Sequence, residues 1–196
     1  MGRFPDGAPA FSRLQTRTPG APTSRPRASD VVINEVMYHP ITGDNGGEFL
    51  ELHNRGASPV DIGNWRLDGG VSFTLPAGLI LAPGAFLVVA NNLTQLRATY
   101  PALNGANSLG NFSGQLSNGG ERIRLRAVET TVTTNALGQV ATNFLRFTVH
   151  EVAYGTGGRW GAWNDGGGSS LELVEARADA RLAPAWADSD ETARNE

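Results

Sequence analysis

The 196-residue sequence contains no cysteine and no lysine, and the absence of cysteine limits what the chain can do. Without cysteine it has no disulfide, no thiolate ligand for a metal and no thiol nucleophile. All 16 basic residues are arginine, and 19 acidic residues leave a formal net charge of −3. This charge supplies no field that would gather a phosphate backbone or an anionic lipid surface, so it argues against nucleic acid as a partner.

Long apolar runs are also missing. No stretch approaches the ~18 apolar residues that a membrane span needs, and the opening residues Met1 to Phe11 lack the apolar segment of a signal peptide. We therefore expect no membrane span and, in the chain as given, no export signal.

Turn-forming residues are abundant instead. The sequence holds 25 Gly and 11 Pro against 18% charged residues, which is typical of many tight turns rather than long helices. Short apolar or alternating runs lie between these turns and predict strands, and the even spacing favours a sandwich over a βαβ fold. Only Leu93 to Tyr100 predicts a helix, which Pro101 ends. The predicted strands cover 31–38, 48–53, 65–67, 71–75, 79–81, 85–90, 122–126, 144–154 and 171–174.

Two hairpins are expected in the second half of the chain. The turn Ser117-Asn118-Gly119-Gly120 predicts one that joins Leu116 to the strand at 122–126. The Thr, Val and Ala residues of Val128 to Thr142 predict a second hairpin, which projects beyond the core. We expect one sandwich domain over residues 30–175, preceded by a linker at 1–29 and followed by a linker to another domain at 176–196.

Four motifs, in this order and spacing, resemble the lamin tail domain: Asn34-Glu35-Val36, Glu51-Leu52-His53-Asn54, Asn64-Trp65-Arg66-Leu67 and Leu81-Ala82-Pro83-Gly84. The resemblance implies an immunoglobulin-like β-sandwich, with residues 128–142 as an insertion. It also implies structural roles for its signature positions, which are Asn34, Glu35, Glu51, Leu52, Asn54, Trp65, Leu67, Pro83 and Gly84.

The segments before and after the predicted domain show weaker resemblances to known sequences. The residues after Tyr154 look like the tail that trails such domains in large bacterial surface or secreted proteins. Residues 2–24 resemble the closing segment of another lamin tail domain, which would make this chain part of a tandem array. The resemblance thus implies a secreted or cell-surface location, and adjacent domains of the same polypeptide as partners.

Catalysis and metal binding find little support in the sequence. His39, His53 and His150 lie in different predicted strands without metal-ligand spacing, so we expect structural roles for them. Glu35 and Glu51 could face each other as an acid and base pair, but structural hydrogen bonding is the simpler interpretation. We predict that the chain is not an enzyme and needs no cofactor.

Two ligand hypotheses stay open. Asp44, Asn45 and Glu48 offer hard oxygens in one loop and are calcium candidates, although Asx and Gly residues also serve tight turns. Trp160 and Trp163, with Arg159, lie in a Gly-rich loop, where aromatic rings either stack on sugars or cap one end of the sandwich.

The sequence therefore predicts a structural and interaction module that contacts other proteins or a surface. The alternative is a carbohydrate-binding module that uses Trp160 and Trp163 on polysaccharide.

Overall fold

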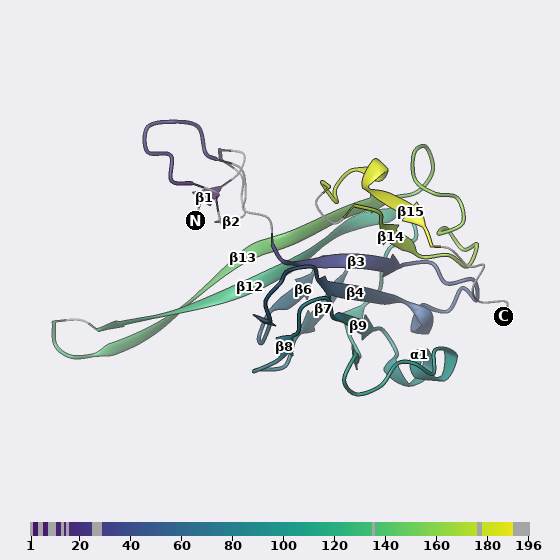
Figure 1. The fold of residues 1–196 in the computed structure, drawn as a ribbon, viewed down its shortest axis with the longest axis horizontal. Helices are drawn as coiled ribbons and strands as arrows, with labels where there is room; N and C mark the ends of the chain where they lie inside the picture. Colours follow the sequence, from purple (N-terminus) through teal and green to yellow (C-terminus); the bar gives the residue numbers. More distant parts are fainter. Residues whose placement is uncertain are drawn as a thin grey trace.

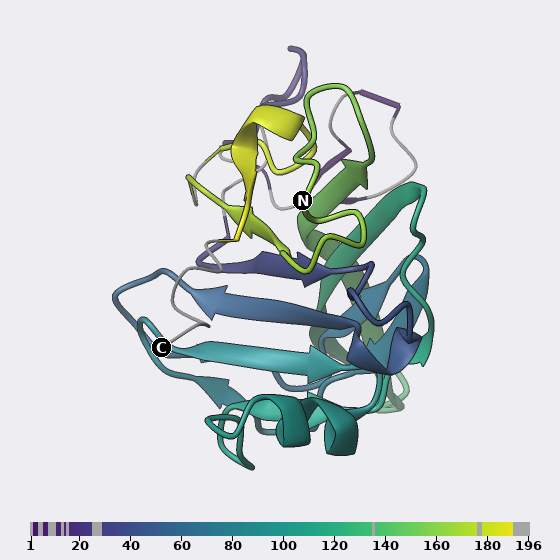
Figure 2. The same ribbon diagram turned by 90° about the vertical axis from the view of Figure 1, so that its right-hand side faces the viewer.

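The structure is a computed structural model, which describes residues 2–3, 6–7, 11–12, 14, 16–24, 29–134, 136–175 and 178–189. Two sheets pack face to face, and a long hairpin leaves the body at one end (Figures 1 and 2). The predicted all-β, immunoglobulin-like sandwich with a projecting hairpin and one short α-helix is confirmed. None of the helices in the described part of the chain has the length and apolarity to cross a membrane.

One sheet has six strands and contains the first two signature motifs. Its order is β10-β9-β4-β3-β14-β15, and all neighbours are antiparallel except β10 and β9. The strands are β3 (Val31–Met37), β4 (Phe49–Asn54), β9 (Phe86–Ala90), β10 (Ser108–Gly110), β14 (Leu171–Leu173) and β15 (Trp186–Asp188).

The other sheet has seven strands in the order β1-β2-β13-β12-β6-β7-β11. They are β1 (Gly2–Arg3), β2 (Phe11–Ser12), β6 (Arg66–Asp68), β7 (Val71–Thr74), β11 (Ser113–Gly114), β12 (Gly120–Thr134) and β13 (Val140–Gly155). A small ladder of β5 (Val60–Asp61) and β8 (Ile80–Leu81) lies apart from both sheets. The 3-10 turns η1 (Asn45–Gly47) and η2 (Ala183–Ala185) complete the elements.

The main core fills the space between the sheets. Alternation turns Leu50 and Leu52 of β4 toward the core, whereas Val31, Val32 and Ile33 of β3 are buried in succession, next to a register shift between Ile33 and Glu35. Signature residues Leu52 and Leu67 belong to this core and are fully buried. Other fully buried members are Val31, Val32, Ile33, Val36, Tyr38, Leu50, Ile62, Val89, Ile123, Leu125, Val152 and Leu171.

A second, smaller core lies on the outer face of the six-stranded sheet. Helix α1 (Leu93–Thr99) packs there, and its Leu96 is buried with Met37, Phe49, Val88 and Ala90. The side chain of Asn92 caps the helix by accepting a hydrogen bond from the amide of Gln95 at 3.2 Å. The helix predicted at 93–100 is therefore confirmed, and it covers only one end of the face.

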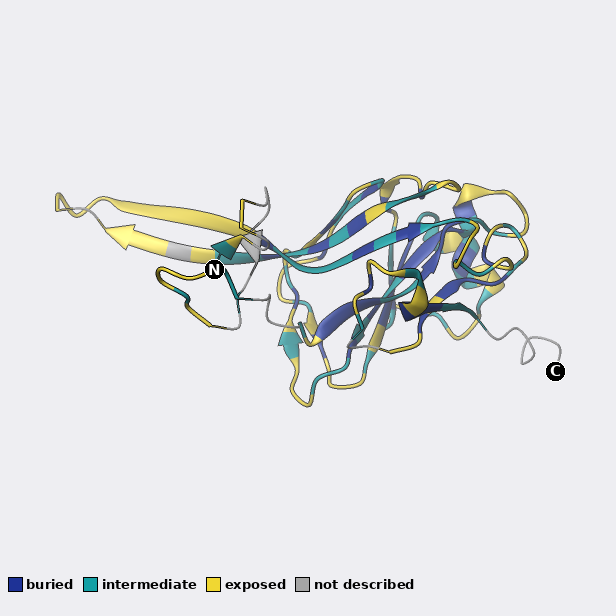
Figure 3. Cartoon of the chain, turned by 90° about the horizontal axis from the view of Figure 1, so that it is seen from above, coloured by how far each residue is buried: buried dark blue, intermediate teal, exposed yellow. Residues whose placement is uncertain are grey.

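The pairing of β12 differs from the prediction. Ser117–Gly120 does not close a hairpin on Leu116, because β12 pairs instead with β13 from Gly120 to Thr134 and with β6. The projecting hairpin is the outer half of this long β12–β13 pair, and it is exposed (Figure 3). A register shift between Leu125 and Arg126 changes which residues of β13 face the core, so Phe147 is buried on one side of it and Val152 and Tyr154 on the other. Leu145 is 40% exposed because it lies in the projecting part of the ribbon.

The sandwich extends beyond Glu175, where we expected the linker to begin. Strand β15 pairs with β14, and its Trp186 is buried against the core. The indole Nε1 of Trp186 donates to the carbonyl of Ala180 at 3.0 Å. At the other end, β2 meets β13 through Ser12 and Thr148.

Candidate functional site

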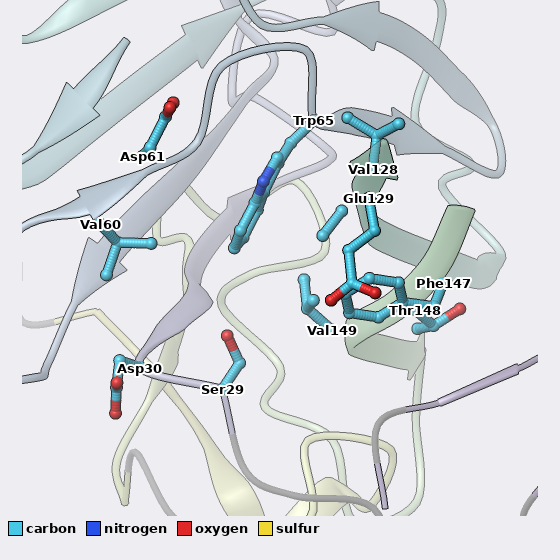
Figure 4. A pocket seen from close by; sticks show the side chains of 11 residues that line it. Ser29, Asp30, Val60, Asp61, Trp65, Val128, Glu129, Phe147, Thr148 and Val149 are labelled. Atoms are coloured by element: carbon cyan, nitrogen blue, oxygen red, sulfur yellow. The ribbon is translucent and has the colours of Figure 1, made fainter. Parts of the chain in front are cut away.

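A cavity of about 320 Å³ opens at the root of the projecting hairpin. Four parts of the chain form its walls: the residues before β3, strand β5, the residue before β6, and the paired strands β12 and β13. Trp65 lies between Val60 on one side and Glu129 on the other (Figure 4). The lining is Ser29, Asp30, Val60, Asp61, Trp65, Ala127, Val128, Glu129, Phe147, Thr148 and Val149.

A tightly bonded loop positions Trp65. The carboxylate of Asp61 accepts a hydrogen bond from the amide of Gly63 at 2.8 Å. Asn64 takes a positive φ of 62°, which Asn tolerates better than most residues. The backbone of Trp65 then accepts from the amide of Leu75 at 2.8 Å and donates to the carbonyl of Ile62 at 3.1 Å. The indole is thereby held half-buried against the core.

The cavity has an acidic character. Asp30, Asp61 and Glu129 are among the lining residues, and the described lining includes no arginine or histidine. An acidic lining around an indole ring suits a cationic group, although the carboxyl groups of Asp30 and Asp61 point away from the ring (Figure 4). The same ring can also stack on the apolar face of a sugar.

The hairpin beyond this cavity is unusually poor in charge. From Thr130 to Leu145 no residue is Asp, Glu, Arg or Lys. The register places Val128, Val132, Val140 and Phe144 on one face of the ribbon. Val132, Val140 and Phe144 are 63%, 66% and 65% exposed, and Leu137 at the tip is 84% exposed.

The family described as Lamin Tail Domain matches residues 24–141 of the chain. The chain belongs to the lamin tail domain family. The match spans β3 to the first residues of β13 and so includes the Trp65 loop and most of the cavity wall. No curated protein matches the chain.

The signature residues of this lamin tail domain mostly hold turns and core. Buried Asn54 donates from its amide to the carbonyls of Ser58 and Leu81, both at 2.9 Å. Gly84 has a φ of +71° and donates its N–H to the carbonyl of Asn54 at 2.7 Å, in the turn that follows Pro83. Asn54 and Gly84 therefore join the β4 end to the β8–β9 turn.

The two tryptophans of the Gly-rich loop, which are the candidates for sugar binding, lie in different environments. Trp160 is partly buried against the core, with its indole beside Gly155. Trp163 is 66% exposed, and its backbone amide donates to the carboxylate of Asp188 at 3.3 Å. Arg159 is exposed. Of the two tryptophans, Trp163 is therefore the more exposed.

The three calcium candidates, Asp44, Asn45 and Glu48, form hydrogen bonds to different groups of the chain. The carboxylate of Asp44 caps η1, accepting from the amide of Gly46 at 2.9 Å and from the side chain of Gln95 at 2.8 Å. Asn45 bonds to Gln115. Glu48 is fully buried and accepts from the amide of Leu116 at 2.9 Å. Within the described residues no group of three or more His, Cys, Asp or Glu side chains is placed to hold a metal ion.

Sequence reasoning missed most of the Trp65 cavity. Trp65 entered only as a signature residue, and its acidic neighbours come from three distant segments with no characteristic spacing. Asp30 precedes β3, Asp61 ends β5 and Glu129 lies on β12. Only the hairpin beside the cavity could be recognised in the sequence, because a long uncharged run of Thr and Val is unusual for an exposed surface.

Proposed function

We propose that this lamin tail domain is a non-catalytic interaction module of a larger, secreted or cell-surface bacterial protein. Its contact surface is the outer half of the β12–β13 hairpin, with the Trp65 cavity at the root. The partner is another folded domain of the same polypeptide, with a second copy of this fold as the first candidate.

The main support is the ribbon between Thr130 and Leu145, whose sequence contains no charged residue and whose described side chains are exposed. Isolated two-stranded ribbons are marginally stable in water, and exposed strand edges usually carry charges that prevent association. In the described residues, β12 has no strand neighbour other than β13 beyond Arg126. A ribbon with apolar side chains and open edges is suited to strand pairing with a partner.

Membership in the family supports the same function, because the fold is an immunoglobulin-like sandwich that presents loops and edges. Fold alone does not fix function, so the proposal depends on the surface. The hairpin projects away from the body and therefore does not cover an edge of its own sheet (Figure 1).

Sedimentation equilibrium of the chain up to about 1 mM tests the proposal, since short tethers between neighbouring copies give effective concentrations in the millimolar range. We expect a monomer–dimer equilibrium, with the double variant Val132→Lys/Phe144→Lys weakening association at least about tenfold. The matched control is Ile80→Lys/Val174→Lys, which adds the same charge at sites that are 55% and 60% exposed. A monomer at the highest concentration, or equal weakening in the control, contradicts the proposal.

The exposure of Trp163 favours a second candidate function, binding of polysaccharide. The test is a panel of polysaccharides, including peptidoglycan, with Trp163→Ala and Trp160→Ala as variants. Saturable binding that Trp163→Ala abolishes supports this function. The absence of binding across the panel rejects it.

A further inference from the structure

The edge of β12 that faces away from β13 is open along the projecting hairpin. Strand β6 pairs with this edge at residues 124–126, and in the described part of the chain no other strand pairs with it. From Ala127 to the end of β12 at Thr134, the edge is therefore available to a further strand. The Trp65 cavity lies where this open stretch begins, because Ala127 is part of its lining.

Symmetry restricts how two copies of the chain can share this edge. A strand that pairs with its own copy across a two-fold axis runs antiparallel to it, because the two strands of a parallel ladder bond differently and no two-fold axis relates them. The axis stands perpendicular to the ribbon and passes through the middle of the shared stretch. Side chains of the same face therefore lie opposite one another.

The valines of β12 select the register. An axis at Thr130, near the middle of the open edge, sets Val128 opposite Val132 of the second copy. Both valines lie on one face of the ribbon, and β-branched side chains directly opposite one another stabilise a ladder. An axis at the next residue would instead set Val128 against Thr134. We therefore place the axis at Thr130.

This register brings the tip of each hairpin to the root of the other. The second copy's ribbon runs along β12 as far as Ala127, where β6 takes over the edge. Trp65 is the residue that precedes β6, so the incoming turn meets the Trp65 cavity. Leu137 is the large apolar side chain of that turn, and it is 84% exposed within one chain. Burial in the cavity would remove this apolar surface from water.

The cavity is suited to a neutral turn with one apolar side chain. Val60, Trp65 and Val149 provide apolar surface. The carboxyl groups of Asp30 and Asp61 point away from the indole, which leaves the ring open to an apolar contact (Figure 4). Because the hairpin tip contains no Asp or Glu, it approaches these carboxylates without like-charge repulsion.

We propose that two copies of this chain pair along β12 about a two-fold axis at Thr130, and that Leu137 of each copy fills the Trp65 cavity of the other. Each cavity is then completed by a residue of the second copy. The inference rests on the proposed function of the hairpin as a contact surface. It adds the direction of pairing, the register and the occupant of the cavity.

Engineered disulfides test the arrangement, because the chain has no cysteine of its own. In Leu137→Cys/Val60→Cys, oxidation in air at about 1 mM protein should link position 137 of one copy to position 60 of the other. Within one chain these positions are separated by the length of the ribbon, roughly 25 Å at about 3.3 Å per residue. A disulfide spans only about 7 Å between Cα atoms, so this link joins two chains.

Matched variants provide the controls, and mass spectrometry of the oxidised products identifies the links. Leu137→Cys/Val174→Cys places the second cysteine at a site that is 60% exposed and far from the cavity lining, and we expect at least about tenfold less linkage between its two positions. Thr130→Cys should link to itself across the axis. Thr142→Cys, at an exposed position of β13, should not.

Substitution at the tip tests the occupant of the cavity. Leu137→Asp would meet the acidic lining, so we expect it to weaken dimerisation at least about tenfold. Leu137→Met keeps an apolar side chain, and we expect less than about a threefold change. Because Leu137 is exposed within one chain, neither substitution should alter the monomer fold. Equal effects of the two variants on the dissociation constant overturn the assignment of Leu137.

The outcomes separate this inference from the proposed function. Links from position 137 to position 60, with the controls silent, support the tip-to-root pairing. A dimer in sedimentation whose links join position 137 to position 137 overturns this pairing and leaves the hairpin as a contact surface. A chain that stays monomeric up to about 1 mM rejects both.

Discussion

The backbone amide of Ile33 donates a hydrogen bond to Nδ1 of His150 at 3.2 Å, and this contact joins the two sheets of the sandwich. Strand β14 pairs with β3 only at Glu35 and Val36, so it does not reach the amide of Ile33. The imidazole of β13 satisfies this donor instead. Because Nδ1 accepts, the ring is neutral and carries its proton on Nε2.

This contact makes the domain sensitive to acid. Burial, together with the positive charge of Arg55, lowers the pKa of His150 from 6.5 to about 3. Below the ordinary pKa the unfolded chain binds a proton at His150 and the folded chain does not. The free energy of unfolding therefore falls as the pH drops, by up to about 1.4 kcal/mol per pH unit from this residue.

We expect His150→Gln to lose this part of the acid decline, because glutamine keeps an acceptor for Ile33 and does not titrate. Urea unfolding of both proteins between about pH 7 and pH 5 measures the effect. The difference in unfolding free energy should shift in favour of the variant as the pH falls. A constant difference over this range contradicts a neutral, half-buried His150.

Glu48 has the opposite dependence on pH. It is fully buried, and its Oε1 lacks a hydrogen-bond partner. Burial raises the pKa of Glu48 from 4.5 to about 7, although hydrogen bonds from Leu116 and Asn91 favour the charged form. Between these values the folded state holds a proton that the unfolded state has lost, so stability falls as the pH rises.

Glu48→Gln should therefore gain stability relative to the wild type as the pH rises from about 4.5 to about 8. We expect a relative gain of roughly 1–3 kcal/mol over this interval, read from urea unfolding at several pH values. A Gln variant whose relative stability stays flat over the interval would show that Glu48 remains ionised in the fold.

Local signals carried much of the fold prediction. The turn motifs around Asn54 and Gly84 and the helix between Asn92 and Pro101 are short-range features, so the sequence reveals them directly. The alternation of Leu50 and Leu52 likewise identifies which side of β4 faces the core. Each of these depends on residues close together in the chain.

Long-range pairing was less visible. The long partner of β12 is β13, and no local pattern distinguishes this from a hairpin with Leu116. The register shift beside Leu125 reverses the alternation along β13, which is why His150 faces a backbone donor. Likewise, the pairing of β15 with β14 depends on three residues around Trp186 that resemble a linker in sequence.

Two phenylalanines on β13 give a matched test of burial. Phe147 is 4% exposed, whereas Phe144 is 65% exposed on the ribbon. We expect Phe147→Ala to cost about 3 kcal/mol of unfolding free energy and Phe144→Ala less than about 0.5 kcal/mol. Urea unfolding measures both. Similar losses for the two variants would mean that the outer ribbon packs against the body in solution.

Trp65 and Leu67 give the corresponding test at the candidate site. If Trp65 were fully buried, Trp65→Ala would cost on the order of 3 kcal/mol, as the sequence pattern suggests. The structure leaves one side of the indole open to the cavity, so we expect Trp65→Ala to cost about 1–2 kcal/mol of unfolding free energy.

Leu67→Ala should cost more, about 3 kcal/mol, because Leu67 is fully buried. Urea unfolding with unchanged m-values is the measurement. A larger loss for Trp65 than for Leu67 would show that the indole is a core residue and that its cavity is closed in solution.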